Sequence, residues 1–249
     1  MAAATRHYES AFDAYLRAVR APYVSVRAAR RALLSDGAKL TARRPLPTGG
    51  HADPSTLKTF DFVLYGRSTH LLLEIKGRRI PARALKPTRP TRPTRPPRTE
   101  SWVTLDDIES LRNWQHIFGP PFRPALVFLY WCPDVVTQRH FPERFDHDGR
   151  LYGIRAIDLD AYTQSMTVRS PRWRTVHLPA AAFDDRTGPL LGPAGLAADP
   201  SETEPEPKIG SRAPALPRSP SAIRASLTVQ ATARSEAQPR PAPAGTISP

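Results

Sequence analysis

The chain has 249 residues, of which 29 are proline, and its formal net charge is +13. This much proline indicates that part of the chain is not packed, while the first 185 residues carry enough apolar side chains for one α/β domain. The positive charge favours a polyanionic partner such as nucleic acid, although a generally arginine-rich proteome would give the same excess. The lone cysteine, Cys132, excludes an internal disulfide. Without a long apolar stretch, we expect a cytoplasmic protein with no membrane partner, and nucleoid association stays open.

The first element is an amphipathic helix, predicted for residues 5–20, where apolar side chains recur at helical spacing. Glu9 lies at the border of that apolar stripe. It is either a solvated surface carboxylate or a side chain that leans toward a site beside the core. Pro22 then ends the helix, and we expect a short strand at residues 23–26 and a second helix at residues 27–34.

A β-hairpin is predicted from two strand-like runs, residues 57–65 and 70–76, joined by a turn at Gly66–Thr69. In that register Asp61 falls directly opposite Glu74. Directly opposed carboxylates repel each other, and a divalent cation between them reverses the sign of the interaction. The hairpin therefore predicts a metal site.

Lys76 completes this cluster, because alternate residues of a strand point to one face and its ammonium shares that face with Glu74. Arg78 and Arg79 follow directly and make the surroundings basic, as a nucleic-acid contact requires. The alternative is that Asp61, Glu74 and Lys76 form a surface ladder of ion pairs, each worth only about 0–1 kcal/mol.

Two low-complexity segments are predicted to lie outside the packed domain. Residues 82–99 contain Thr-Arg-Pro three times, which favours extended polyproline II and forbids a helix or a central strand. This insertion either binds phosphates through its arginines or has no function. Residues 186–249 are rich in Pro, Ala and Ser without periodicity, so we expect a disordered tail. The domain would then span residues 1–185.

A capped helix is predicted for residues 102–119, with Thr104 as its N-cap and Asp107 reaching back to the cap. Gln115 lies near the centre of the apolar face of this helix, either as a buried amide satisfied by the backbone or pointing toward the hairpin. The uninterrupted apolar run at residues 125–132 predicts a strand buried on both faces. Shorter elements are expected beyond it, namely strands at residues 151–157 and 175–178 and helices at residues 159–166 and 179–183.

With helix, hairpin, capped helix and buried strand in this order, the chain resembles the PD-(D/E)xK nuclease superfamily, and archaeal-type Holliday-junction resolvases in particular. The resemblance covers residues 1–132 and implies a restriction-endonuclease-like α/β fold, in which a mixed central sheet is flanked by helices. The matching residues are Glu9 on the first helix, Asp61 on the first hairpin strand, and Glu74, Ile75 and Lys76 on the second.

The chain departs from the superfamily pattern in three places. Phe60 precedes Asp61 where the superfamily name has a proline, the Thr-Arg-Pro insertion falls just past the hairpin, and the segment after residue 132 has no counterpart. These departures leave the substrate open, because substrate choice on a shared fold depends on additions to the core.

The resemblance and the preference of Mg²⁺ for oxygen ligands together imply a Mg²⁺ site, with Mn²⁺ as a substitute. Lys76 would position or deprotonate the attacking water and stabilise developing negative charge. Gln115 would be an accessory contact to the cluster. The metal ligands would be Asp61, Glu74, the backbone carbonyl of Ile75 and, as an outer ligand, Glu9.

The function that these residues predict is a Mg²⁺-dependent endonuclease that hydrolyses phosphodiester bonds in DNA during repair, recombination or restriction. A homodimer would suit two-fold DNA, and the oligomeric state stays open. The first alternative is a non-catalytic nucleic-acid-binding protein that retains the nuclease fold. A second is an interaction protein whose Pro-rich segments dock on aromatic-lined partners.

Overall fold

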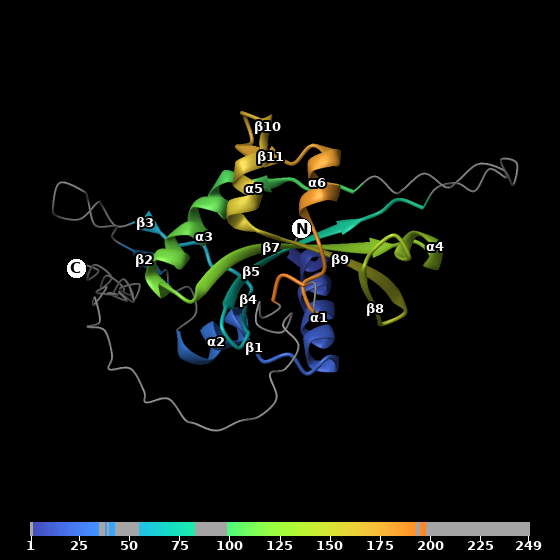
Figure 1. Ribbon diagram of the computed structural model, residues 1–249. Coiled ribbons are helices and arrows are strands. Elements are labelled where there is room, and N and C mark those ends of the chain that lie inside the picture. Colours follow the sequence, from blue (N-terminus) through green and yellow to red (C-terminus); the bar gives the residue numbers. More distant parts are fainter. Residues whose placement is uncertain are drawn as a thin grey trace, which may run out of the picture.

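The computed structural model describes residues 2–34, 38, 40–42, 55–82, 99–192 and 195–197. Its centre is a six-stranded mixed sheet with helices on both faces (Figure 1). The spatial order of the strands is β1 (Tyr23–Ser25), β4 (Phe62–Tyr65), β5 (His70–Arg79), β7 (Phe122–Cys132), β9 (Arg150–Asp158) and β8 (Glu143–His147).

The helices divide between the two faces of this sheet (Figure 1). One face is covered by α1 (Ala2–Ala18). The opposite face is covered by α3 (Leu105–Phe118), α5 (Leu159–Ser165) and α6 (Ala180–Arg186). Two short helices, α2 (Val26–Leu33) and α4 (Val135–Gln138), follow β1 and β7 along the chain.

Two small sheets accompany the central one. The first contains β10 (Thr167–Ser170), β11 (Thr175–His177) and β6 (Val103–Thr104), and it leads directly into α3. The second pairs β2 (Thr41–Ala42) with β3 (Ser55–Thr56).

β5 and β7 are parallel neighbours at the centre of the sheet, paired from His70↔Phe122 to Arg79↔Trp131. A parallel pair needs a crossover connection, and α3 is part of it. Residues 125–130 of β7 are fully buried, which confirms the strand predicted to be buried on both faces. The hydrophobic core accordingly has two layers, one on each side of this sheet.

The predicted hairpin is confirmed in register and in its turn. β4 and β5 pair antiparallel from Phe62↔Leu73 to Tyr65↔His70, and the N–H of Gly66 donates to the carbonyl of Thr69 at 3.0 Å. The first strand is shorter than expected, because the chain bends at Asp61, and the second continues to Arg79.

The helical predictions are confirmed within a few residues at each end. Tyr8, Phe12 and Leu16 form the buried stripe of α1, and α3 has the predicted capping box, in which the side chains of Thr104 and Asp107 each bond to the other residue's N–H. β8 was not predicted, since as an edge strand it alternates only half-buried and exposed residues and lacks an apolar run.

The packed part of the chain extends beyond the predicted boundary at residue 185. Gly188 exchanges two backbone hydrogen bonds with Ala156, at 2.8 and 3.0 Å, and Leu190 is fully buried on the α1 face of the sheet. The N–H of Leu190 also donates to the carboxylate of Glu143. The boundary was therefore placed too early, because a short apolar segment among prolines and glycines has no periodicity to reveal it. Residues 83–98 and 198–249, on which most of the insertion and tail predictions fall, lie outside the described residues.

The structure thus has the expected class, a mixed α/β fold with a mixed sheet between helices. Among the described residues, none of the helices combines the length and the apolar character needed to cross a membrane.

Candidate functional site

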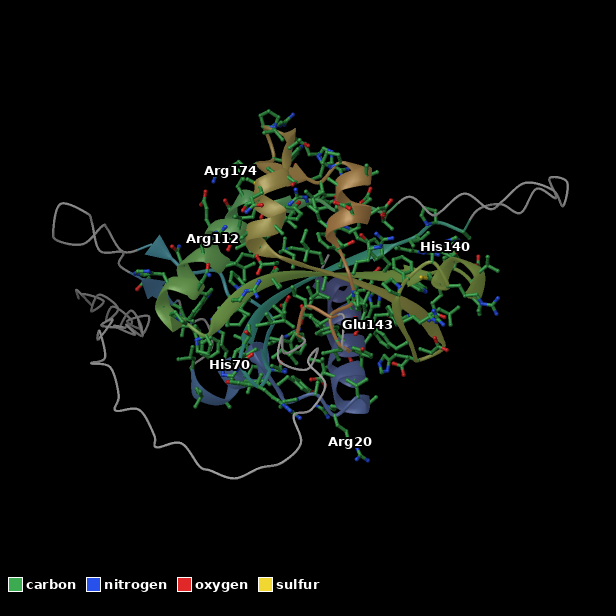
Figure 2. The ribbon with its side chains drawn as sticks, viewed as in Figure 1. Arg20, His70, Arg112, His140, Glu143 and Arg174 are labelled. Carbon is green, nitrogen blue, oxygen red and sulfur yellow. The ribbon has the colours of Figure 1, made fainter. Side chains whose placement is uncertain are left out.

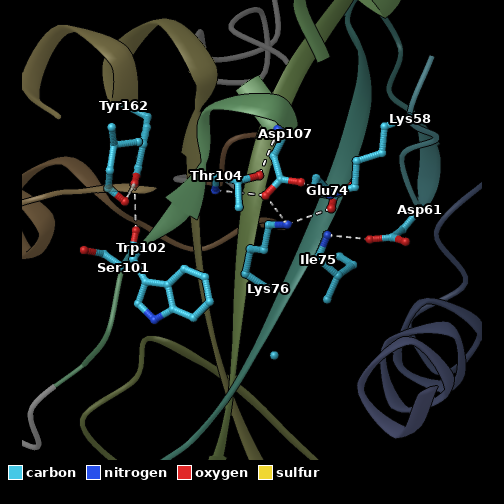
Figure 3. A network of polar contacts seen from close by, with 12 residues as sticks. Lys58, Asp61, Glu74, Ile75, Lys76, Ser101, Trp102, Thr104, Asp107 and Tyr162 are labelled. Carbon is cyan, nitrogen blue, oxygen red and sulfur yellow. Dashed lines mark hydrogen bonds and ion pairs between the residues drawn. The ribbon is translucent and has the colours of Figure 1, made fainter. Parts of the chain in front are cut away.

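Asp61 forms the bend that precedes β4. Its backbone N–H donates to the carbonyl of Leu73 at 3.0 Å, and its Oδ2 accepts a hydrogen bond from the N–H of Ile75 at 2.7 Å (Figure 3). Through this side-chain hydrogen bond, Asp61 stays attached to β5 beyond the last regular backbone pair of the two strands. Asp61 lies next to Glu74 as the register predicted, but just outside the ladder rather than within it.

The electrostatic state of Asp61 is unusual for a carboxylate. The pKa of Asp61 is raised from the ordinary 3.8 to about 8, mainly by burial and also by the negative charges of Glu74 and Glu9. The Ile75 N–H and Lys76 lower the pKa, but by less than these effects raise it. At neutral pH the side chain consequently holds a proton unless a cation replaces it.

Glu74 and Lys76 extend from β5 toward α3, on the face opposite to α1. Glu74 is only 8% exposed, and its Oε1 accepts a hydrogen bond from Nζ of Lys76 at 2.8 Å. Burial raises the pKa of Glu74, an effect that the ammonium of Lys76 opposes. The structure therefore brings the predicted Glu-x-Lys pair together inside the protein rather than on a solvated surface.

Asp107, at the N-terminus of α3, is a site residue that sequence reasoning missed. Its Oδ2 lies 2.6 Å from Nζ of Lys76, and its Oδ1 contacts the ammonium of Lys58 (Figure 3). These two cations lower the pKa of Asp107 to about 2 against the effect of its burial. The capping box predicted the position of Asp107 on its helix. No local pattern could have revealed that β5 carries Lys76 to that helix end.

The pKa of Lys76 is raised, because Glu74 and Asp107 outweigh the burial of the ammonium. Lys76 is therefore positively charged at neutral pH. This state allows the side chain to orient an anion or a water molecule and to stabilise negative charge, but not to remove a proton.

Glu9 lies on α1 at the other side of Asp61, close enough for its charge to raise the pKa of Asp61. Its Oε2 accepts a hydrogen bond from Nη1 of Arg27 at 2.7 Å. Arg27 belongs to α2, and its pairing with Glu9 was not predicted. Glu9 is thus neither a free surface carboxylate nor a direct partner of Glu74 or Lys76.

Gln115 is not the buried amide expected as one alternative, and its accessory contact to the cluster stays a prediction. Gln115 is half-buried at the side of α3, and its Oε1 accepts a hydrogen bond from Arg112 at 3.4 Å. The sequence centred the apolar face too far round the helix, since Phe118, an apolar residue near Gln115, is 38% exposed. The buried residues of α3 are instead Asp107, Ile108, Ser110, Leu111 and Trp114.

Arg78 and Arg79 lie on opposite faces of the sheet, as strand alternation requires. Arg78 is largely enclosed: its guanidinium donates to the carbonyl of Trp102 at 2.5 Å and lies 4.1 Å from the centre of the Trp102 ring. Arg79 is exposed and stacks on Trp131 at 4.6 Å. Of the two predicted nucleic-acid contacts, only Arg79 presents its charge at the surface.

A metal ion at this site would have few protein ligands. Among the residues that the structure describes, no group of three or more His, Cys, Asp and Glu side chains is arranged to hold a metal. Asp61 and Glu74 nevertheless fit a cation chemically, since they form a buried carboxylate pair that retains a proton at neutral pH, and a cation can take the place of that proton. Two carboxylates completed by a carbonyl and solvent suit Mg²⁺, which usually keeps several waters.

Comparisons with known proteins yield no relative: no family model, no curated protein and no solved structure matches this chain.

Proposed function

We propose that the protein is a metal-dependent nuclease that hydrolyses phosphodiester bonds in DNA, in repair, recombination or restriction. The observation that carries the proposal is the placement of Asp61, which is held against β5 by the Ile75 N–H at 2.7 Å, beside buried Glu74 and the ammonium of Lys76. Two carboxylates can hold a metal ion for phosphodiester hydrolysis, and a lysine can stabilise the negative charge that develops on the phosphate.

The order of elements supports the assignment to the PD-(D/E)xK superfamily. α1 carries Glu9, β4 follows Asp61, β5 carries Glu74 and Lys76, and α3 then leads into β7, which runs parallel to β5. This is the succession on which the resemblance to archaeal-type Holliday-junction resolvases rests.

A bound Mg²⁺ would supply Lewis acidity and orient the phosphate, with Asp61, Glu74 and the carbonyl of Ile75 as the groups that would hold it. Lys76 stays protonated because two carboxylates hold it, so we assign it the orientation of the attacking water and the stabilisation of negative charge on the phosphate. This narrows the role expected from the sequence, which included deprotonation. Asp107 keeps the ammonium in place through the 2.6 Å contact.

The test is to incubate the purified chain with branched, nicked and linear DNA, with and without Mg²⁺. We expect Mg²⁺-dependent cutting by the wild type and a loss of at least about 100-fold in the Asp61→Ala, Lys76→Ala double variant. The matched control is Asp185→Ala, Arg186→Ala, which removes one acid and one base from the exposed end of α6. Cutting that survives in the Asp61/Lys76 variant would refute the assignment.

One observation favours the non-catalytic alternative, a nucleic-acid-binding protein with the same fold. Lys76 is satisfied by Glu74 and Asp107 without any ligand, so the cluster is partly neutralised within the protein. This alternative predicts DNA binding that weakens steeply with salt and no turnover with either Mg²⁺ or Mn²⁺.

A further inference from the structure

An exposed tryptophan, Trp173, lies in the turn between β10 and β11, and the backbone of this turn is hydrogen-bonded to the N-terminus of α3. Trp173 is 68% exposed, whereas Trp114 in α3 is 8% exposed. The indole belongs to neither of the two hydrophobic core layers that the described residues form. A side chain of this size in water has an unfavourable hydration that binding a partner would relieve.

The turn that presents Trp173 is well defined. The N–H of Arg174 donates to the carbonyl of Pro171 at 3.2 Å, which places Trp173 at the third position of a four-residue turn. Before the turn, the register of β10 against β11 shifts between Val168 and Ser170, a bulge that increases the local twist of the hairpin.

The turn is also anchored at the proposed active site. The carbonyl of Arg174 accepts a hydrogen bond from the N–H of Leu105 at 2.8 Å, and Leu105 begins the helical turn that delivers Asp107 to Lys76. Figure 2 shows Arg174 at the same end of the molecule as the start of α3. Trp173 is therefore one residue from a backbone contact to the helix end that contains the site.

The surroundings of Trp173 are basic. The guanidinium of Arg172 lies 5.3 Å from the centre of its ring. Arg174 is paired with Asp106 and Glu109 on the exposed side of α3, and Arg169 lies near Glu100, whereas Arg172 has no acidic partner among the residues described here. An exposed aromatic ring beside an uncompensated arginine is the combination that stacks on a nucleobase next to a phosphate.

We propose that Trp173 stacks on an unpaired base of DNA held at the active site, so that the substrate is single-stranded or contains a branch or flap, rather than being an intact duplex. The inference rests on the proposed nuclease function for the placement of the DNA. It goes beyond that function in naming the form of the substrate. A base inside a duplex offers no free face to an indole, whereas every unpaired base does, which makes stacking tolerant of sequence.

The experiment measures the affinity of the full-length chain for a fluorescently labelled oligo-dT strand and for a blunt duplex of the same length, by anisotropy in EDTA. We expect Trp173→Ala to lose about 5- to 100-fold in affinity for the single strand and to bind the duplex unchanged. Trp173→Phe keeps an aromatic face and should retain most of the affinity. Val168→Ala is the matched control, since Val168 is an equally exposed apolar neighbour, at 67%, without a ring.

Quenching of intrinsic tryptophan fluorescence by unlabelled oligo-dT reports on the ring itself and should be reduced in Trp173→Phe. Equal affinities of wild type and Trp173→Ala for the single strand would overturn the inference, as would an equal loss for both DNA forms. If Trp173→Ala instead abolishes a concentration-dependent dimer, the ring contacts a second copy of the chain and the inference is wrong. The binding assay contains EDTA and is therefore independent of cutting. Single-strand binding through Trp173, combined with no cutting when Mg²⁺ is added, would refute only the nuclease proposal.

Discussion

The ammonium of Lys76 lies 2.6 Å from Oδ2 of Asp107, a residue that also forms the capping box of α3. One aspartate therefore performs two tasks: it satisfies the backbone at the start of a helix and fixes the lysine of the adjacent strand. Because of this contact, the geometry of the candidate site depends on the docking of α3 against β5.

Asp107→Ala should destabilise the protein by about 3–5 kcal/mol, since it removes one of the two hydrogen bonds of the capping box and leaves Lys76 with one carboxylate in a buried place. The pKa of Asp107 is lowered to about 2, so its contribution to stability is complete above its ordinary pKa near 4 and is lost as the pH falls toward 2. Urea denaturation at pH 7 and pH 3 measures both effects. The control is Asp106→Ala, whose side chain is 67% exposed and should matter by less than about 0.5 kcal/mol. Equal losses in the two variants would contradict the role of Asp107.

Asp61→Asn should stabilise the metal-free protein increasingly as the pH rises from 4 to 8. The folded protein binds more protons than the unfolded chain between the ordinary pKa of 3.8 and the raised value of about 8, so the wild type loses stability across this range. A gain on the order of 5 kcal/mol at pH 8 and almost none at pH 4 is expected from denaturation curves in EDTA. The wild type alone should recover that stability on addition of Mg²⁺. A variant that responds to Mg²⁺ as the wild type does would show that Asp61 holds no cation.

Gly77→Ala should cost about 1–3 kcal/mol, because a Cβ at this position would lie 2.1 Å from Cδ2 of Tyr8. The missing side chain lets α1 approach β5, and this approach brings Glu9 close to Asp61. The double variant Gly77→Ala, Tyr8→Ala should lose less than the sum of the two single variants, as measured by thermal denaturation. Gly188→Ala is the control, since a Cβ there meets no atom within 4 Å. Additive losses of stability would mean that the effect of Gly77→Ala does not arise from a clash with the Tyr8 ring.

Ending the chain after Arg186 should destabilise the domain by about 2–5 kcal/mol, whereas ending it after Ala197 should leave stability within about 0.5 kcal/mol of the full chain. The shorter form loses the burial of Leu190 and leaves the carboxylate of Glu143, which also contacts the hydroxyl of Tyr15, without its backbone donor. Chemical denaturation of the three lengths tests this. Indistinguishable stabilities for the two truncated forms would restore the boundary predicted at residue 185.

Much of the fold was predictable from local pattern. The hairpin register follows from alternation and a four-residue turn, and the start of α3 follows from a capping box that acts within four residues. The burial of β7 follows from its uninterrupted apolar run. Edge strand β8 and the segment around Leu190 were missed, since neither has an apolar periodicity and both are stabilised only by their neighbours in space.

For the candidate site, sequence alone determined that Asp61, Glu74 and Lys76 would lie together, because strand pairing and alternation are properties of adjacent residues. Only the tertiary structure decided that Asp107 holds Lys76 and that Arg27 pairs with Glu9. Those contacts join elements distant in the chain. They depend on the angle and distance at which each helix packs on the sheet, which the whole core sets and no short stretch of residues encodes.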